Sequence, residues 1–348
     1  MLKKKIAVVG AGIFGCSIAL ELDKKGYKVE LFEKESDIML KATKNNHNRI
    51  HYGYHYPRSL ETTRQSLDGL LSFVSYYGDS IVYGFKNYYA IAKEGSHVSA
   101  DFFKNFCNEA RIGFEPRFPE SNLLNKEMIS ESFLVEEPVY DWTKLQEIVK
   151  FKLSQSNVKL RLSTNYINCR ENFDFTINCA YSNINEISKF HKVEQLSFKK
   201  QDIIIPIFKS NIERIGLTVM DGPFCSVMPK GNELNKFLLY HAKYSIAEES
   251  INSNLKLDSN INDRINLILE KSKLFYPFLK DVELIGNWRC ERAIPITNND
   301  ARISEIISYD SNPNLITVFS GKVSTAVKIA KQICEGLKTG NFNSKIHV

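Results

Sequence analysis

Residues 3–22 have the sequence KKKIAVVGAGIFGCSIALEL, and two very different interpretations fit it. Three lysines, an apolar run and the pair Gly15–Cys16 resemble the signal of a secreted bacterial lipoprotein. Such a signal usually has a longer unbroken apolar core and small residues before the cysteine. Here Phe14 stands two residues before Cys16, and glycines interrupt the apolar run. The lipoprotein interpretation is therefore disfavoured.

The alternative is a strand, a glycine turn, a helix and a second strand. Residues 6–9 form a short β-branched run that suits a buried parallel strand. The spacing GxGxxG follows over residues 10–15, and a helical apolar pattern then continues until Gly26. Residues 28–32 predict a second strand, which Glu33 closes. This order is typical of a dinucleotide-binding unit, and it predicts an α/β fold.

Each marked residue of this unit has a physical role. Gly10 permits the tight turn, and Gly12 lets the backbone approach a pyrophosphate at the positive end of the helix. Gly15 and Ala19 let the helix pack closely against the strands. Glu33 lies 18 residues after Gly15, where a carboxylate can accept both ribose hydroxyls. An acid here suits an unphosphorylated ribose, which predicts FAD or NAD rather than NADP.

Composition excludes several other classes of protein. The chain has 348 residues, enough for two domains, and 43% hydrophobic with 25% charged residues is usual for a globular protein. A formal charge of +6 without a basic block makes a nucleic-acid partner unlikely. The sequence contains no uninterrupted apolar stretch of about 18 residues, so we expect no transmembrane helix. Seven widely spaced cysteines favour buried thiols in a reducing, cytoplasmic location.

Residues 42–58, ATKNNHNRIHYGYHYPR, are too polar for a core element and predict a loop. His51 and His55 are four residues apart, which would suit a metal site on a helix. However, Gly53 and Pro57 disfavour a regular helix, and no acidic cluster completes a ligand set. We therefore expect no metal. A histidine that only packs or bonds the backbone remains the alternative role for these side chains.

The glycine turn, Glu33 and the loop pattern N…IHxGxxYP together resemble the FAD-dependent D-amino-acid oxidase superfamily. The similarity points to its glycine oxidase, L-2-hydroxyglutarate oxidase and glycerol-3-phosphate dehydrogenase branches. The resemblance implies FAD as the cofactor, with the loop beneath the flavin. It implies that Thr43 and Asn46 contact FAD and that His51 and Gly53 lie beside the isoalloxazine ring.

Three later segments carry the same resemblance. Residues 173–183, FDFTINCAYSN, resemble the strand that returns to the cofactor domain, with Ala180 passing the adenosine and Tyr181 where a glycine is usual. Residues 286–303 resemble the segment whose arginine pairs with the substrate carboxylate, and this position is Arg292. A structural ion pair is the alternative role for Arg292. The family aspartate falls on Asn299 or Asp300.

Residues 315–337, LITVFSGKVSTAVKIAKQICEGL, predict a strand, a turn and a closing helix. The resemblance makes this element a flavin clamp, with the helix beginning near Ser324 and its positive end towards the flavin. Lys322 faces either the flavin edge or the substrate, or is a solvated surface lysine. In all, the predicted cofactor contacts are Gly10, Gly12, Ile13, Phe14, Gly15, Glu33, Lys34, Thr43, Asn46, His51, Gly53, Ala180, Gly321, Lys322, Ser324 and Thr325.

The remaining periodicities predict helices over 59–77, 99–110, 141–154 and 261–279, and strands over 85–92 and 158–162. Residues 115–140 are expected to be irregular, and residues 195–245 alternate as in an antiparallel sheet. Leu71, Phe102, Phe103 and Phe106 are expected in the core. We expect a Rossmann-like FAD domain formed by residues 1–80, 140–190 and 285–340, interleaved with a substrate domain formed by residues 81–139 and 191–284.

The predicted function is that of an FAD-dependent oxidase or dehydrogenase acting on a small 2-hydroxy acid or amino acid. His51, Arg292 and Lys322 are its candidate catalytic residues, and the electron acceptor is oxygen, a quinone or a carrier. One alternative is oxidation of an amine or alcohol on a larger intermediate, such as a sugar derivative or a modified RNA base. Another alternative is a flavin-binding protein without catalysis.

Overall fold

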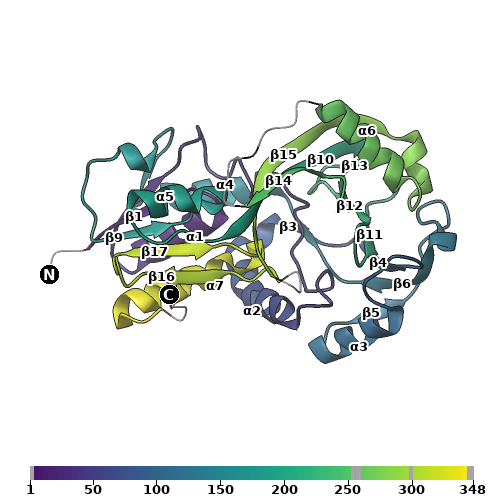
Figure 1. The fold of residues 1–348 in the computed structure, drawn as a ribbon, viewed down its shortest axis with the longest axis horizontal. Helices are drawn as coiled ribbons and strands as arrows, with labels where there is room; N and C mark the ends of the chain where they lie inside the picture. Colours follow the sequence, from purple (N-terminus) through teal and green to yellow (C-terminus); the bar gives the residue numbers. More distant parts are fainter. Residues whose placement is uncertain (1–3, 252–254, 256–259, 298–300, 343–348) are drawn as a thin grey trace.

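The protein has two lobes, each built around a β-sheet (Figure 1). The computed structural model describes residues 4–251, 255, 260–297 and 301–342. The predicted aspartate position at Asn299 or Asp300 lies outside the described residues. Strands of the two sheets alternate along the sequence, so the chain crosses from one sheet to the other more than once.

A six-stranded sheet forms the first lobe. Its order is β16-β17-β9-β1-β2-β8, and every neighbouring pair is parallel except β16 with β17. The bounds are β1 Lys5–Val9, β2 Lys28–Phe32, β8 Lys159–Arg161, β9 Phe175–Asn178, β16 Glu305–Ser308 and β17 Leu315–Phe319. The strand predicted over residues 28–32 is confirmed to the residue.

Helices bury both faces of this sheet, as a parallel sheet requires. Ile6 and Val8 of β1 point into one core with α1 and α7, whereas Ala7 and Val9 point into the opposite core with α5. The helices of this lobe are α1 Ile13–Lys24, α2 Leu60–Tyr77, α4 Trp142–Ser154, α5 Ile184–Phe190 and α7 Ala326–Thr339. Ser59 and Asp141 cap α2 and α4 through their side chains, which sets the helix starts.

A nine-stranded sheet forms the second lobe. Its order is β14-β10-β13-β12-β11-β4-β6-β5, with β15 also paired to β10, and only β11 with β4 is parallel. The bounds are β4 Lys86–Ala92, β5 Phe114–Pro116, β6 Ile129–Val135, β10 Phe198–Lys209, β11 Ile215–Met220, β12 Cys225–Pro229, β13 Lys236–His241, β14 Ile246–Ile251 and β15 Glu283–Pro295. The helices α3 Ala100–Ala110 and α6 Ile261–Ser272 pack on it, and β3 Ile81–Val82 pairs with β7 Val139–Tyr140.

These sheets confirm the predicted fold class, a parallel Rossmann-like sheet joined to a largely antiparallel one. Residues 285–295, assigned from the sequence to the cofactor domain, lie in β15 of the nine-stranded sheet. The domain boundaries themselves stay a prediction. No helix among the described residues is long and apolar enough to cross a membrane.

Several local predictions were wrong. Residues 115–140 are not irregular, because β6 and β7 lie there; Ser130 and Glu131 interrupt the apolar pattern of β6, so no local signal marks it. Leu71 is 82% exposed and Phe102 is 48% exposed, because each lies one position away from the buried stripe of its helix. The helix predicted to Leu279 ends at Ser272, since Pro277 pushes Tyr276 into an extended conformation.

Candidate active site

A cavity of about 600 Å³ lies where the ends of β1, β2 and β9 meet strands β10, β13 and β15 of the second sheet. It is long enough to touch the glycine turn at one end and the 42–58 loop at the other. Thirteen of the predicted site residues line it: Gly10, Gly12, Ile13, Phe14, Glu33, Lys34, Thr43, Asn46, His51, Ala180, Arg292, Gly321 and Lys322. The fold therefore brings predicted site residues from five distant segments of the sequence into one cavity.

The glycine turn is shaped by two tight contacts and one open position. A Cβ at Gly15 would lie 1.9 Å from the Gly10 carbonyl oxygen, and a Cβ at Gly10 would lie 2.7 Å from the Cys179 carbonyl oxygen. These glycines let α1 and β9 approach β1. At Gly12 the nearest atom to a Cβ would be Thr43 Oγ1 at 3.5 Å, so this position is open towards the cavity.

The open turn and its neighbours fit the pyrophosphate and ribose of FAD. Gly12 precedes the first turn of α1, where backbone N–H groups and the helix dipole favour an anion. Thr43 Oγ1 accepts a hydrogen bond from Ile13 N at 3.2 Å, which ties the 42–58 loop to this helix end. Glu33 accepts from Ala11 N at 2.8 Å and from Glu35 N at 3.0 Å, and a carboxylate keeps further acceptor sites for ribose hydroxyls.

The turn after β9 has adapted to the residue that replaces the usual glycine. Tyr181 has φ +53°, in the left-handed region that glycine adopts without strain. Its hydroxyl donates to the Ala293 carbonyl at 3.3 Å, so the side chain links the β9 turn to β15. Ala180 and Tyr181 both line the cavity. The backbone thus keeps the close approach although the glycine is absent.

Four predicted contacts do not line the cavity. Gly15 packs against Gly10, and Gly53, at φ +107°, packs against Thr63 of α2, whose Cγ2 would be 2.2 Å from an added Cβ. Ser324 and Thr325 are buried in the turn before α7, where Thr325 Oγ1 donates to the Lys322 carbonyl at 2.7 Å. Helix α7 begins at Ala326 after a 3₁₀ turn over Val323–Thr325, slightly later than predicted.

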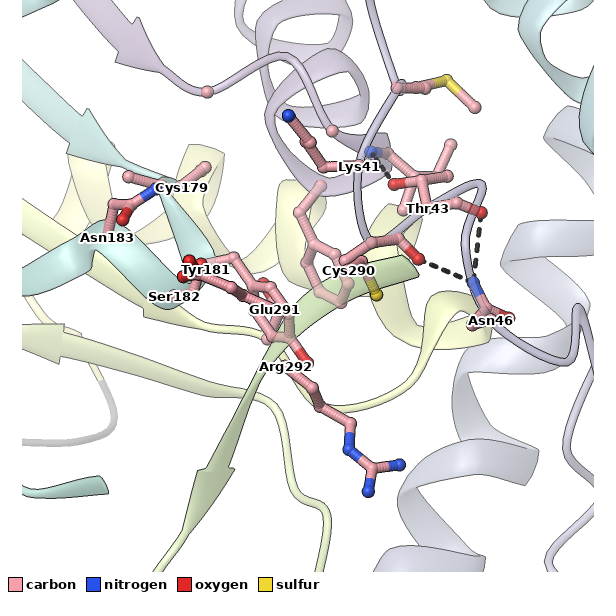
Figure 2. A pocket seen from close by; sticks show the side chains of 18 of the residues that line it. Lys41, Thr43, Asn46, Cys179, Tyr181, Ser182, Asn183, Cys290, Glu291 and Arg292 are labelled. Carbon is pink, nitrogen blue, oxygen red and sulfur yellow. Dashed lines mark hydrogen bonds between the residues drawn. The ribbon is translucent and has the colours of Figure 1, made fainter. Parts of the chain in front are cut away.

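Asn46 lines the cavity, but its side-chain amide is hydrogen-bonded to other residues of the protein. Its amide donates to the carbonyls of Ala42 and Thr43 at 2.7 and 3.1 Å and to the Tyr140 hydroxyl at 2.7 Å. Figure 2 shows the bond between Asn46 and Thr43. Its carbonyl oxygen accepts from Asn48 N at 2.6 Å. Asn46 therefore shapes the loop, and its predicted contact with FAD stays a prediction.

Arg292 reaches into the other half of the cavity from β15 (Figure 2). Gln201 Oε1 accepts from Arg292 Nε at 3.2 Å and from Nη2 at 2.6 Å, and the Tyr240 hydroxyl accepts from Nη2 at 2.8 Å. Among the described residues Arg292 forms no ion pair and Nη1 donates to nothing. Two neutral groups therefore fix the guanidinium and leave its charge uncompensated. Arg289 on the same strand is instead paired with Asp202 at 2.6 Å.

Another arginine of the cavity, Arg49, is buried under the 42–58 loop. Arg49 donates to the Tyr89 hydroxyl and to Thr218 Oγ1, each at 2.7 Å, and to Glu137 Oε2 at 3.3 Å. The Arg49 side chain is 3% exposed and that of Glu137 is fully buried. Burial would raise the pKa of Glu137, but its contacts with His51, Arg49 and Tyr89 lower it to about 2. Glu137 is thus a buried carboxylate at neutral pH.

Three histidines of the loop approach this pair and the cavity. Burial, together with the charges of Lys322 and Arg49, lowers the pKa of His51 to about 4 although Glu137 opposes this. Burial also lowers the pKa values of His47 and His55. Their rings are therefore neutral at pH 7. Within the described part of the chain, His47 Nε2, His51 Nδ1 and His55 Nδ1 are buried without a hydrogen-bond partner.

Lys322 lies in the cavity wall and is not a free surface lysine. Its ammonium donates to the Tyr56 hydroxyl and lies 4.0 Å from the centre of that ring. The sequence suggested Lys322 as a candidate, but it missed Tyr56 as its partner. It also missed Arg49, Glu137, Gln201 and Tyr240, which no spacing pattern marks. Their neighbours in the sequence gave no signal either, since Arg49 follows Asn48 and Glu137 stands between Glu136 and Pro138.

Three comparisons relate this chain to known proteins. Residues 5–131 match the family model DAO, described as FAD dependent oxidoreductase. The FAD-dependent monooxygenase kojA of Aspergillus flavus is 27% identical over 373 residues, which cover 94% of this chain and 84% of that protein.

Two solved structures share the fold of nearly the whole chain. Glycine oxidase from Geobacillus kaustophilus has a TM-score of 0.77 and 10% identity, and covers 98% of this chain and 96% of its own. L-α-glycerophosphate oxidase from Mycoplasma pneumoniae, solved with FAD bound, has a TM-score of 0.77 and 14% identity over the full length of both chains. With the glycine turn and Glu33 in one cavity, these findings indicate an FAD-dependent oxidoreductase whose residues 5–131 match the DAO family model and whose fold is shared with these two enzymes.

Proposed function

We propose that this enzyme oxidises the carbon that bears the OH or NH2 group in a small 2-hydroxy acid or amino acid. The observation that carries the proposal is the uncompensated guanidinium of Arg292 in the cavity. Arg292 is partly buried, and a partly desolvated charge without a counter-ion is unfavourable, so a bound carboxylate would compensate it. Gln201 and Tyr240 already accept from Nε and Nη2 of Arg292, so the two N–H groups of Nη1 remain to donate to a carboxylate oxygen.

The bound FAD would supply the two-electron acceptor, which takes a hydride from the substrate carbon at flavin N5. The residues of the chain then have three tasks. Gly10, Gly12, Thr43 and Glu33 hold the cofactor. Arg292 fixes the substrate carboxylate and thereby the position of the reacting carbon. His51, neutral at pH 7 and in the cavity wall, accepts the proton of the OH or NH2 group.

The role of Lys322 follows from its contact with Tyr56. Held against that ring, its ammonium adds positive charge to the wall where Arg292 already lies, which favours an anionic substrate. The cytoplasmic location predicted from the cysteines is part of this proposal. All seven cysteines are free thiols, and six of them are buried, as expected for a reducing compartment.

The test is anaerobic reduction of the flavin by matched pairs of compounds. Each 2-hydroxy acid or amino acid is paired with its own amide or methyl ester, which keeps the reacting carbon and removes the charge. We expect the flavin absorbance to bleach with at least one acid and not with its uncharged partner. Equal bleaching by the uncharged partners would overturn the carboxylate assignment.

A second candidate function is monooxygenation, favoured by the relative named FAD-dependent monooxygenase that matches 94% of this chain. In that reaction the flavin is reduced by an external donor and an oxygen atom enters the substrate. The same anaerobic experiment separates the two functions when NADH or NADPH is added in place of the substrate. Bleaching by the nicotinamide and by none of the acids would favour the monooxygenase.

A further inference from the structure

The carboxylate of Glu137 lies at the centre of a buried polar cluster between β6 and β7. Its Oε2 accepts from Arg49 Nη1 at 3.3 Å and from the Tyr89 hydroxyl at 2.5 Å. Its other oxygen, Oε1, accepts from the backbone N–H of Tyr52 at 3.0 Å. The same oxygen faces His51 Nδ1 at 3.6 Å. Glu137 therefore joins the buried Arg49 to the loop that carries the proposed proton acceptor.

The ion pair with Arg49 explains the contacts of only one of the two Glu137 carboxylate oxygens. Oε2 meets Arg49 and Tyr89, whereas Oε1 is directed at the loop, where Tyr52 N fixes the backbone next to His51. His51 Nδ1 is buried and has no other partner among the described residues. At 3.6 Å the contact is longer than a hydrogen bond, and a shift of a few tenths of an ångström would close it.

The two nitrogens of His51 lie in different surroundings. Nδ1 is buried against Glu137, while the side chain retains 15% exposure. The exposed part of the ring is therefore the opposite edge, which carries Nε2, and His51 lines the cavity. A carboxylate accepts hydrogen bonds and cannot donate them, so it favours the tautomer with the proton on Nδ1.

We propose that Glu137 is the positioning residue of His51: it holds the neutral ring with its proton on Nδ1 and leaves Nε2 facing the substrate as the base. This inference rests on the proposed function. In the step itself the O–H or N–H bond of the substrate breaks and an N–H bond forms at Nε2. The ring becomes an imidazolium between the substrate and Glu137, whose negative charge stabilises it.

The charges around His51 determine whether its ring is neutral, and the proposed tautomer requires a neutral ring. Glu137 faces it from the β6–β7 connection, Lys322 from the turn after β17, and Arg49, His47, His55 and Tyr56 from its own loop. The two cations and the burial oppose protonation, and Glu137 favours it. The neutral ring is thus the resting form at pH 7.

The test is the tautomer of His51 in the FAD-loaded enzyme, measured by NMR with ¹⁵N-labelled histidine. The His51→Asn variant assigns the signals. We expect a protonated Nδ1 and an unprotonated Nε2 at pH 7. The reverse tautomer in the wild-type enzyme would overturn the proposal, and this measurement needs no variant to fold.

Glu137→Gln sharpens the test because its amide has to arrange itself among donors. Arg49 and Tyr89 both donate at Oε2, so the amide oxygen takes that side and the NH2 group faces His51 Nδ1. We expect the proton to move to Nε2. Tyr89→Phe is the matched control: it removes a neighbour from the other side of Glu137 and leaves the carboxylate, so Nδ1 stays protonated. An unchanged tautomer in folded Glu137→Gln would contradict the proposal.

Flavin reduction provides the second readout. We expect the limiting rate constant at saturating substrate to fall on the order of a hundredfold or more in Glu137→Gln, with the dissociation constant of the substrate within about twofold because Arg292 is untouched. A loss confined to substrate binding would contradict a positioning role. The Nδ1–H tautomer without reduction by any acid would instead refute the proposed function and leave the tautomer assignment intact.

Discussion

The cavity contains two arginines in opposite electrostatic situations, Arg49 buried and Arg292 partly exposed. Arg49, under the 42–58 loop, has a buried carboxylate partner in Glu137 and two hydroxyl acceptors. Arg292, on β15, is held by an amide and a phenol and forms no ion pair among the described residues. A buried charge that already has its counter-ion supports structure, and one that lacks it creates demand for an anion. Arg49 therefore supports the structure of the site, and under the proposed function Arg292 binds the substrate carboxylate.

The largest effect should come from Arg49→Met, which leaves Glu137 buried and uncompensated. We expect the free energy of unfolding to fall by about 3–5 kcal/mol, measured by denaturant titration of the FAD-loaded enzyme. Lys86→Met is the control, because Lys86 pairs with Glu213 on the surface, where ion pairs contribute little. If both variants lose the same stability, Arg49 is not the structural partner described above.

Arg292→Ala should affect the substrate rather than the fold. Removing one partner of a buried charge pair costs about 2–5 kcal/mol, so we expect kcat/KM for the carboxylate substrate to fall roughly thirtyfold to several-thousandfold. The free energy of unfolding should change much less than in Arg49→Met, since no carboxylate loses its partner. Unchanged kcat/KM would show that the substrate carboxylate binds elsewhere.

Low pH should lower the free energy of unfolding, because His51 and Glu137, on the Arg49 side of the cavity, take up protons. The pKa of His51 falls from 6.5 to about 4 on folding and that of Glu137 from 4.5 to about 2. In both cases the unfolded chain binds the proton first, so stability present at higher pH is lost as pH falls. We expect losses of at most about 3 kcal/mol each, from pH 6.5 to 4 for His51 and from 4.5 to 2 for Glu137.

Variants assign these two segments of the pH profile. His51→Asn should flatten the upper segment in part, since His47 and His55 titrate in the same direction. Glu137→Gln should flatten the lower segment. Arg292→Ala should leave both segments in place, because Arg292 is not among the charges that shift the pKa of His51 or of Glu137. A profile that neither His51→Asn nor Glu137→Gln alters would contradict the assignment.

The smallest effect is expected for Tyr240→Phe. The variant removes the hydroxyl that accepts from Arg292 Nη2 at 2.8 Å and keeps the ring, whose centre lies 5.5 Å from the guanidinium carbon. We expect the substrate to bind about 1–2 kcal/mol more weakly, seen as a raised dissociation constant with little change in the limiting rate. A larger loss than in Arg292→Ala would mean that Tyr240 itself contacts the substrate.

Local pattern predicted the strands and the helix of the dinucleotide-binding unit well. The glycine spacing, the apolar strands and Glu33 lie within one continuous unit, where each residue type serves its neighbours. The helix caps Ser59 and Asp141 likewise act within one turn. The strand β6 was missed because its partner β4 lies about forty residues earlier, and only that pairing makes a strand of a segment containing Ser130 and Glu131.

The reactive half was predicted only in part. Resemblance to a family pointed to His51, Arg292 and Lys322, but the residues that give them their properties are distant in sequence. Arg49 and Glu137 are 88 residues apart, and Arg292 and Gln201 are 91 apart. No local spacing rule relates such pairs, because strand pairing and loop packing set them: Gln201 and Arg292 are directly opposite each other on β10 and β15.

The sequence by itself therefore determined the dinucleotide-binding unit, because turn geometry, helix polarity and a ribose carboxylate are properties of consecutive residues. It determined the presence of a charged, histidine-rich loop, but not its chemistry. Only the tertiary structure decided which arginine has a counter-ion and which nitrogen of His51 meets Glu137. Those properties depend on burial and on contacts between segments far apart in the sequence, which exist only once the chain has folded.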